Sequence, residues 1–156
     1  MPNYLSIASG RQQKLAPAWL QASRTEEIIA FHRTVTLTSA SAGTAVSLIS
    51  EAEVPAGFAV FVQDWTAKVN GGTLWGTVST VKIQDTNGTP ADFSTLAVAG
   101  LAANAFLKPN SSNVTVDSAM ALGAGGTAGK GLQVKANANG TGSPLVVTVT
   151  GYLKRA

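Results

Sequence analysis

The alternation of apolar and polar residues divides this chain near residue 30. From Phe31 onward, short runs rich in threonine and valine place an apolar side chain at every second position. That period is typical of a β-strand with one buried face and one wet face. The residues before Phe31 lack the alternation. The pattern predicts an all-β domain over residues 31–156, preceded by an N-terminal arm over residues 1–30.

About eight strands are expected, a number that favours two packed sheets, as in a β-sandwich or jelly roll. Asn70, Gly71 and Gly72 predict a tight hairpin, because these residues tolerate positive φ. Within the longest strand the apolar positions change parity, and a β-bulge near Gln63 and Asp64 would account for the change. The expected strands span residues 31–38, 44–50, 58–69, 73–84, 93–99, 114–122 (one broken strand or two short ones), 132–136 and 145–153.

Two long connections are rich in small residues. Residues 100–113 are expected to form a loop with Leu101, Phe106 and Leu107 tucked beneath it. Residues 123–131 are rich in glycine, but they lack the pattern of a phosphate-binding P-loop, whose Gly-Lys pair is followed by Ser or Thr and then by a helix. The second connection is therefore interpreted as a flexible connector.

The arm carries apolar residues that need burial somewhere. Pro17–Ser23 and Thr25–Ile29 could each form a helical turn or two, but helices this short are marginal in water. Fully extended, thirty residues reach about 100 Å. The arm could therefore fold back over its own sheet or lie on another subunit.

The composition narrows the function classes. The chain of 156 residues is 45% hydrophobic but only 12% charged, against about 25% in typical domains. A neutral, polar surface can be covered by neighbours with little desolvation of ions, which favours a packed assembly. The net charge of +3 includes no dense basic stripe, so nucleic-acid binding is not expected. Neither a secretory signal nor a membrane span is expected, and the lack of cysteine excludes a disulfide framework.

Few residues could support catalysis. His32 is the single histidine, and no nucleophile or orienting carboxylate lies near it in sequence. One histidine without cysteine makes a zinc site improbable, and we expect no cofactor. The scattered carboxylates lack the spacing of a calcium loop or of a glycosidase pair, and two of them look like turn formers. These carboxylates are Asp64, Asp85, Asp92 and Asp117, of which Asp85 and Asp92 are the turn formers. We therefore expect a protein that is not an enzyme.

Trp65 and Trp75 lie on opposite sides of the predicted hairpin, each five residues from its turn. In register they would face each other across two strands. Such a pair could belong to a core or an interface, or it could stack a sugar ring. The second possibility defines the alternative function, a carbohydrate-binding or receptor-binding module; the resemblance described next would make it part of a phage tail fibre or tailspike.

Several segments carry a resemblance to a known family: Glu53–Val62, Ala67–Thr73, Gly129–Val134 and Gly140–Tyr152. Their pattern and turn chemistry resemble the small jelly-roll cement or decoration proteins on the heads of tailed bacteriophages. The resemblance covers roughly residues 31–153. It implies a structural virion protein, made in the host cytoplasm, that binds the outside of the capsid between major capsid subunits. It also implies a homo-oligomer, with a trimer favoured over a dimer.

In this family an N-terminal arm often supplies contacts with the capsid or between subunits. The arm of this chain has the length and the apolar residues for that role. Its aromatic and aliphatic residues would be anchors, since such residues dominate interface hot spots, and its basic residues could pair with capsid carboxylates. The predicted contact residues are Arg11, Lys14, Leu15, Trp19, Leu20, Arg24 and Ile28.

Overall fold

The computed structural model describes residues 4–6, 12–14, 28–38, 41, 43–71, 78, 80–109, 114–115, 125–138 and 142–156. Within these ranges the chain is built from β-strands, with one 3-10 turn, η1, at Glu51–Glu53. No helix in the described part of the chain is long and apolar enough to span a membrane. The strands are β1 (Tyr4–Ser6), β2 (Gln12–Lys14), β3 (Ile29–Leu37), β4 (Val46–Ile49), β5 (Phe58–Val69), β6 (Thr80–Asp85), β7 (Asp92–Ala97), β8 (Phe106–Leu107), β9 (Val114–Thr115), β10 (Leu132–Ala136) and β11 (Leu145–Arg155).

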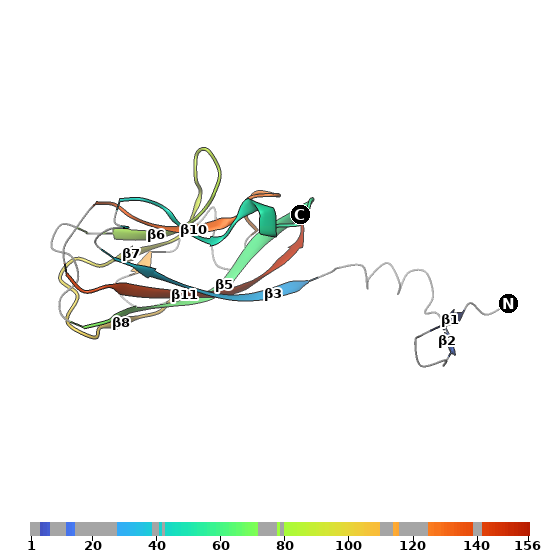
Figure 1. Ribbon diagram of the computed structural model, residues 1–156, viewed down its shortest axis with the longest axis horizontal. Coiled ribbons are helices and arrows are strands. Elements are labelled where there is room, and N and C mark those ends of the chain that lie inside the picture. The colour runs from blue at the N-terminus through green and yellow to red at the C-terminus, as the bar shows by residue number, and fades with distance from the viewer. Residues whose placement is uncertain are drawn as a thin grey trace.

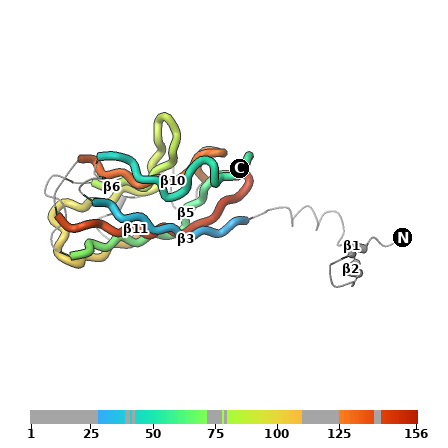
Figure 2. Tube along the Cα trace, viewed as in Figure 1, coloured from blue at the N-terminus to red at the C-terminus, as the bar shows by residue number. Residues whose placement is uncertain are grey.

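Two antiparallel sheets form the body of the molecule (Figures 1 and 2). One has four strands in the order β3-β11-β5-β8, and the other has five in the order β4-β10-β6-β7-β9. A single cluster of buried apolar side chains draws on both sheets, an arrangement consistent with a β-sandwich. β1 and β2 form a separate two-stranded sheet. The prediction of an all-β fold is confirmed.

β11 is one of the two inner strands of the four-stranded sheet, and its predicted inward residues are buried. It pairs along its length with β3 on one side and β5 on the other. Leu145, Val147 and Val149 are fully buried, while the residues between them are only partly covered. Each such side chain contributes about 1.5–3 kcal/mol through burial.

The predicted β-bulge in β5 is confirmed. Thr150 of β11 lies opposite Asp64, whereas the next residue, Gly151, lies opposite Val62. Gln63 is therefore the extra residue. Without the extra residue, the apolar positions in the second half of β5 would face away from the core. The bulge turns them back, so the apolar residues on both sides of it are buried beneath one sheet.

The predicted hairpin after β5 is wrong. β5 lies between β11 and β8, while β6 lies in the other sheet between β10 and β7. The chain therefore crosses from one sheet to the other after Gly71. The turn chemistry itself was interpreted correctly, since Gly71 has a φ of 114°. The backbone N–H of Asn70 donates to the carbonyl of Pro144, so this corner is joined to the start of β11.

The glycine-rich connection differs from its prediction as a flexible connector. In its described part, the N–H groups of Gly126 and Gly129 donate to the carbonyls of Val60 and Phe58, both at 2.8 Å. Gly125 forms a β-bridge with Phe61, where a Cβ would come within 2.7 Å of the ring. The loop thus covers the edge of β5 that the short β8 leaves unpaired, which protects an edge strand from unwanted pairing.

Two smaller predictions also need correction. Leu101 and Leu107 are buried as expected, but Phe106 is 58% exposed because it is the outward residue of β8, opposite Lys68. Ile29, expected in a helical turn, is the first residue of β3. The other predicted turn, at residues 17–23, lies outside the described residues.

Candidate functional site

The structure places the single histidine on an open sheet surface. His32 is exposed on β3 and lies in one row with Thr150 of β11 and Asp64 of β5. Two strand spacings, about 10 Å, separate the histidine from the carboxylate, which is too far for a hydrogen bond. In the described part of the chain, no group of three or more His, Cys, Asp or Glu residues could hold a metal ion.

Asp85 is a turn former, as the sequence indicates. Its buried carboxylate accepts hydrogen bonds from the N–H groups of Asn87 (3.3 Å) and Ala91 (2.9 Å). It also accepts one from the hydroxyl of Thr127 at 3.2 Å. The residue therefore fixes the β6–β7 connection, which projects above the five-stranded sheet in Figure 1, and joins it to the glycine-rich loop.

Trp65 belongs to the core. It is 1% exposed and lies opposite Val149 of β11, and among the described residues its indole N–H has no hydrogen-bond partner. A side chain this deeply buried cannot stack a sugar ring at the surface. The hypothesis of a sugar platform formed by two tryptophans is therefore wrong for Trp65, and Trp75 lies outside the described residues.

The predicted contact residues of the arm fall mostly outside the described part of the chain. Lys14 is described only as the last residue of β2, and Ile28 is the one whose side chain is described. Ile28 is 56% exposed, so its side chain could contact another subunit. The predicted residues outside the described ranges are Arg11, Leu15, Trp19, Leu20 and Arg24.

Apolar side chains gather where the arm joins the sheet. Ile29, beside Ile28, is 38% exposed, and these two are among the three large hydrophobic residues that are exposed in the described part of the chain. The neighbouring Ala30 lies in one row with Tyr152 and Phe61, whose rings stack with centroids 5.1 Å apart. We call Ile28, Ala30, Phe61 and Tyr152 the junction patch; Ile29 lies in the row of Leu153 and Val60, on the other face of the sheet. The start of β3 and the C-terminus lie at this same end (Figure 1).

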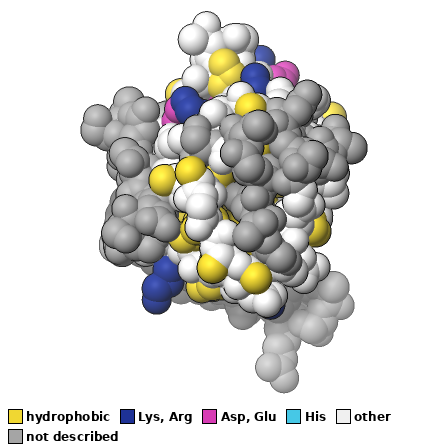
Figure 3. Space-filling model, turned by 90° about the vertical axis from the view of Figure 1, so that its left-hand side faces the viewer, with side chains coloured by type: hydrophobic (Ala, Val, Ile, Leu, Met, Phe, Trp, Pro, Cys, Tyr) yellow, Lys and Arg dark blue, Asp and Glu magenta, His cyan; other side chains and the backbone are white. Residues whose placement is uncertain are grey.

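The opposite end of the molecule looks different. Figure 3 views that end, and where its side chains are described the apolar ones lie scattered among polar atoms rather than in one patch. Single exposed apolar residues are normal on a soluble protein, whereas neighbouring ones suggest a contact site. The junction patch is therefore the better candidate for an interface.

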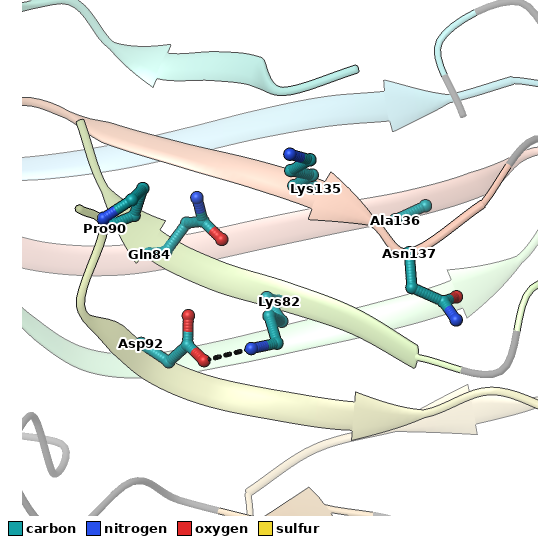
Figure 4. Close-up of a pocket in the computed structure, with 7 residues that line it drawn as sticks. All are labelled: Lys82, Gln84, Pro90, Asp92, Lys135, Ala136 and Asn137. Carbon is teal, nitrogen blue, oxygen red and sulfur yellow. Dashed lines mark hydrogen bonds and ion pairs between the residues drawn. The ribbon is translucent and has the colours of Figure 1, made fainter. Parts of the chain in front are cut away.

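A cup on the outer face of the five-stranded sheet is the second candidate (Figure 4). Its volume is about 380 Å³, within the range of small-molecule sites. β6 and β10 form its floor, and Pro90 of the β6–β7 connection stands at its side. The lining residues are Lys82, Gln84, Pro90, Asp92, Lys135, Ala136 and Asn137.

The cup brings together groups that are distant in sequence. Lys82 forms an ion pair with Asp92 of β7, and it lies directly opposite Lys135 of β10. Gln84 is only 5% exposed although it faces the cup. Sequence reasoning missed this site. The outward positions of Lys82 and Gln84 could be read from the buried Val81 and Ile83, but the approach of β10 could not.

The comparisons with known proteins identify no family. No protein-family model matches this chain, and no curated protein sequence matches it. Function is therefore inferred from the order of the strands, the junction patch and the cup.

Proposed function

We propose that this protein is a structural virion protein, a cement or decoration protein that binds the outside of a tailed-phage head and stabilises contacts between capsid subunits. The observation that carries the proposal is the exposure of Ile28 where the arm meets the sheet, two residues before Ala30, whose row holds the stacked rings of Tyr152 and Phe61. Apolar surface gains about 25 cal/mol per Å² when it is removed from water. A partner that covers the junction patch would recover this free energy.

The pairing of the strands supports a jelly roll, the fold that the resemblance implies. β3 is counted as the first strand and β11 as the last. The first strand then pairs with the last, and each further pair is nested inside the one before it in chain order: β3:β11, β4:β10, β5:β8 and β6:β7. Rolling such a ribbon so that successive strands alternate between two sheets yields a jelly roll. β9 then extends one edge, beside β7. This is a scaffold that presents loops and an arm, with no need for a catalytic centre.

The mechanism is multivalent attachment. In the proposal, the body sits as a homo-oligomer, a trimer rather than a dimer, over the place where major capsid subunits meet. Each arm then binds a neighbouring subunit, and the first contact raises the effective concentration of the others. The low charge of the chain helps, because few ions need to lose water when the surface is covered.

Deletion of residues 2–27 tests the arm, because it leaves β3 intact. The full chain and the truncated chain are mixed with heads of the phage whose genome encodes the protein, and co-sedimentation is measured. We expect the truncated chain to keep its β circular-dichroism spectrum and to lose binding. Undiminished binding would remove the arm from the mechanism.

A matched pair of point variants tests the junction patch separately. Ile28→Asp and Phe106→Asp each place one carboxylate at an apolar side chain of similar exposure. Phe106 lies opposite Lys68, toward the other end of the four-stranded sheet. We expect Ile28→Asp to weaken head binding about tenfold or more, in the range of an interface hot spot, and Phe106→Asp to leave it unchanged. Equal effects of the two variants would contradict a specific role for the patch.

A further inference from the structure

Among the described residues, the charged side chains that line the cup are two lysines and one aspartate, so their charges do not balance. Lys82 and Lys135 are register partners on adjacent antiparallel strands, and like charges in that position repel. Asp92 neutralises Lys82. Within the described part of the chain, Lys135 has no ion pair, and the pairing of β10 with β4 ends at Val134, one residue before it. The cup therefore carries one excess positive charge.

Gln84 adds an unmet hydrogen-bonding group. It lies between Gln133 of β10 and Asp92 of β7, and it is nearly buried. Its carboxamide makes no hydrogen bond to any group in the described part of the chain, and in Figure 4 it stands between the two lysines and Pro90. Trp65 Nε1 is the one buried side-chain polar atom without a partner among the described residues, so the polar atoms of the Gln84 carboxamide are accessible from the cup. The amide could donate to an anion and accept from a hydroxyl.

The shape of the cup favours a small polar molecule over a peptide. β6 is paired on both sides, by β10 and β7, so an incoming strand finds no free edge. None of the cup's described lining residues has an aromatic or large aliphatic side chain of the kind that anchors a protein partner. Pro90, Ala136 and the methylenes of the two lysines supply apolar atoms, while the carboxylate of Asp92 could accept a hydrogen bond from a hydroxyl group.

We propose that the cup binds a small carboxylate that carries hydroxyl groups, with Lys135 and Gln84 holding the carboxylate. Such a molecule is either a free hydroxy acid or the acidic sugar unit of a glycan. The single excess charge matches a monoanion, whereas a phosphate dianion would leave negative charge beside Asp92. This site is independent of the junction patch, so it does not rest on the proposed role at a phage head.

Titration of the ¹⁵N-labelled full chain tests the site by nuclear magnetic resonance. The probes are D-glucuronate, D-glycerate, D-glucose and inorganic phosphate at one ionic strength. We expect saturable shifts of the Gln84 side-chain amide and of the Lys82 and Lys135 backbone amides with a hydroxylated carboxylate. Tighter binding of glucuronate would assign the site to an acidic sugar, and tighter or equal binding of glycerate would assign it to a free hydroxy acid. Glucose or phosphate binding as tightly as the carboxylates would overturn the proposal, as would the lack of any saturable shift.

A matched pair of lysine variants supplies the control. Lys135→Gln and Lys68→Gln remove the same charge from an exposed lysine, but Lys68 lies on β5 in the other sheet. We expect Lys135→Gln to weaken carboxylate binding about tenfold, since a charge-assisted hydrogen bond is lost, and Lys68→Gln to change it less than about twofold. Equal losses of carboxylate affinity in both variants would show that the net charge of the protein alone attracts the ligand, and would overturn the proposal.

Discussion

The outer faces of the two sheets differ in whether their polar side chains find partners within the protein. On the four-stranded sheet the polar groups satisfy one another: the hydroxyls of Thr34 and Thr148 lie 2.9 Å apart, and the hydroxyl of Thr150 donates to the carbonyl of Asp64. On the five-stranded sheet, Lys135 and Gln84 have no such partners in the described part of the chain. The first face can be covered by a neighbour at little cost, whereas the second holds groups that a polar ligand would satisfy.

The difference follows from residue type. Threonine is short, favours strands, and can pair with another threonine across them. Lysine carries its charge on a long stem and cannot satisfy a second lysine opposite it. The contrast is between a face whose threonine hydroxyls pair with each other and a face on which two lysines oppose each other, and each prediction below perturbs one side of it.

The largest effect is expected from the core beneath the four-stranded sheet. Trp65→Ala removes the largest fully buried side chain and leaves a cavity between the sheets. We expect a loss of about 3–5 kcal/mol in the free energy of unfolding, measured by urea denaturation. Thr66→Ala, at the next position on the opposite face of β5, should cost much less. Similar losses in the two variants would contradict the assignment of inner and outer faces.

Asp85→Ala should have the next largest effect, and it acts mainly on the five-stranded side. The variant removes a buried carboxylate that accepts three hydrogen bonds and leaves their donors unpaired. We expect a loss of about 3 kcal/mol by urea denaturation. Changes in the backbone amide chemical shifts, measured by nuclear magnetic resonance, should extend through the β6–β7 connection to the residues beside Pro90. The amide shifts of Thr34 and Thr148 should stay unchanged. Asp85→Asn keeps an acceptor oxygen and should lose less. Shifts spread equally over both sheets would contradict a local role.

Much of the strand architecture could be predicted because it is encoded locally. β5 has the bounds that the alternation predicts, its change of parity marks the bulge at Gln63, and β10 and β11 alternate as expected. Period-2 patterning needs no knowledge of the neighbouring strand.

What could not be predicted depends on contacts between distant segments. Gly71 has the positive φ that its residue type suggests, yet the strands around it enter different sheets. The choice of β11 as the partner of β5 spans some eighty residues, and a local turn signal does not encode it. The cup is hidden for the same reason, because the approach of Lys135 to Lys82 depends on the register between β10 and β6.

Single substitutions on the two outer faces should change stability in opposite directions. Thr148→Val removes one hydroxyl of a cross-strand pair and should cost about 0.5–1 kcal/mol. Lys135→Gln relieves the repulsion between opposed lysines and should leave stability unchanged or raise it by a few tenths of a kcal/mol. Urea denaturation in low salt measures both. A loss of stability in Lys135→Gln equal to that of Thr148→Val would contradict the view that the lysine face is unsatisfied.

The smallest effect concerns η1, whose two glutamates each join it to one sheet. Glu51 has a lowered pKa because the hydroxyl of Thr86 and the ammonium of Lys130 donate to it. Glu53 has a lowered pKa because the backbone N–H and hydroxyl of Ser50 donate to it, with Arg33 of β3 nearby.

A lowered pKa in the folded state means that the unfolded chain binds more protons in acid. The stability supplied by Glu51 and Glu53 is therefore complete above about pH 4.3, the ordinary glutamate value, and is lost as the pH falls through their lowered pKa values. The free energies of unfolding of the protein and of a Glu51→Gln, Glu53→Gln double variant, measured by urea denaturation, should differ at pH 7 and converge once the pH falls below the lowered pKa values of the two glutamates. A difference that does not shrink in acid would show that the variant acts through packing. Because the glutamates are exposed, salt should weaken their contribution at pH 7. Each single variant then tells which sheet depends more on η1.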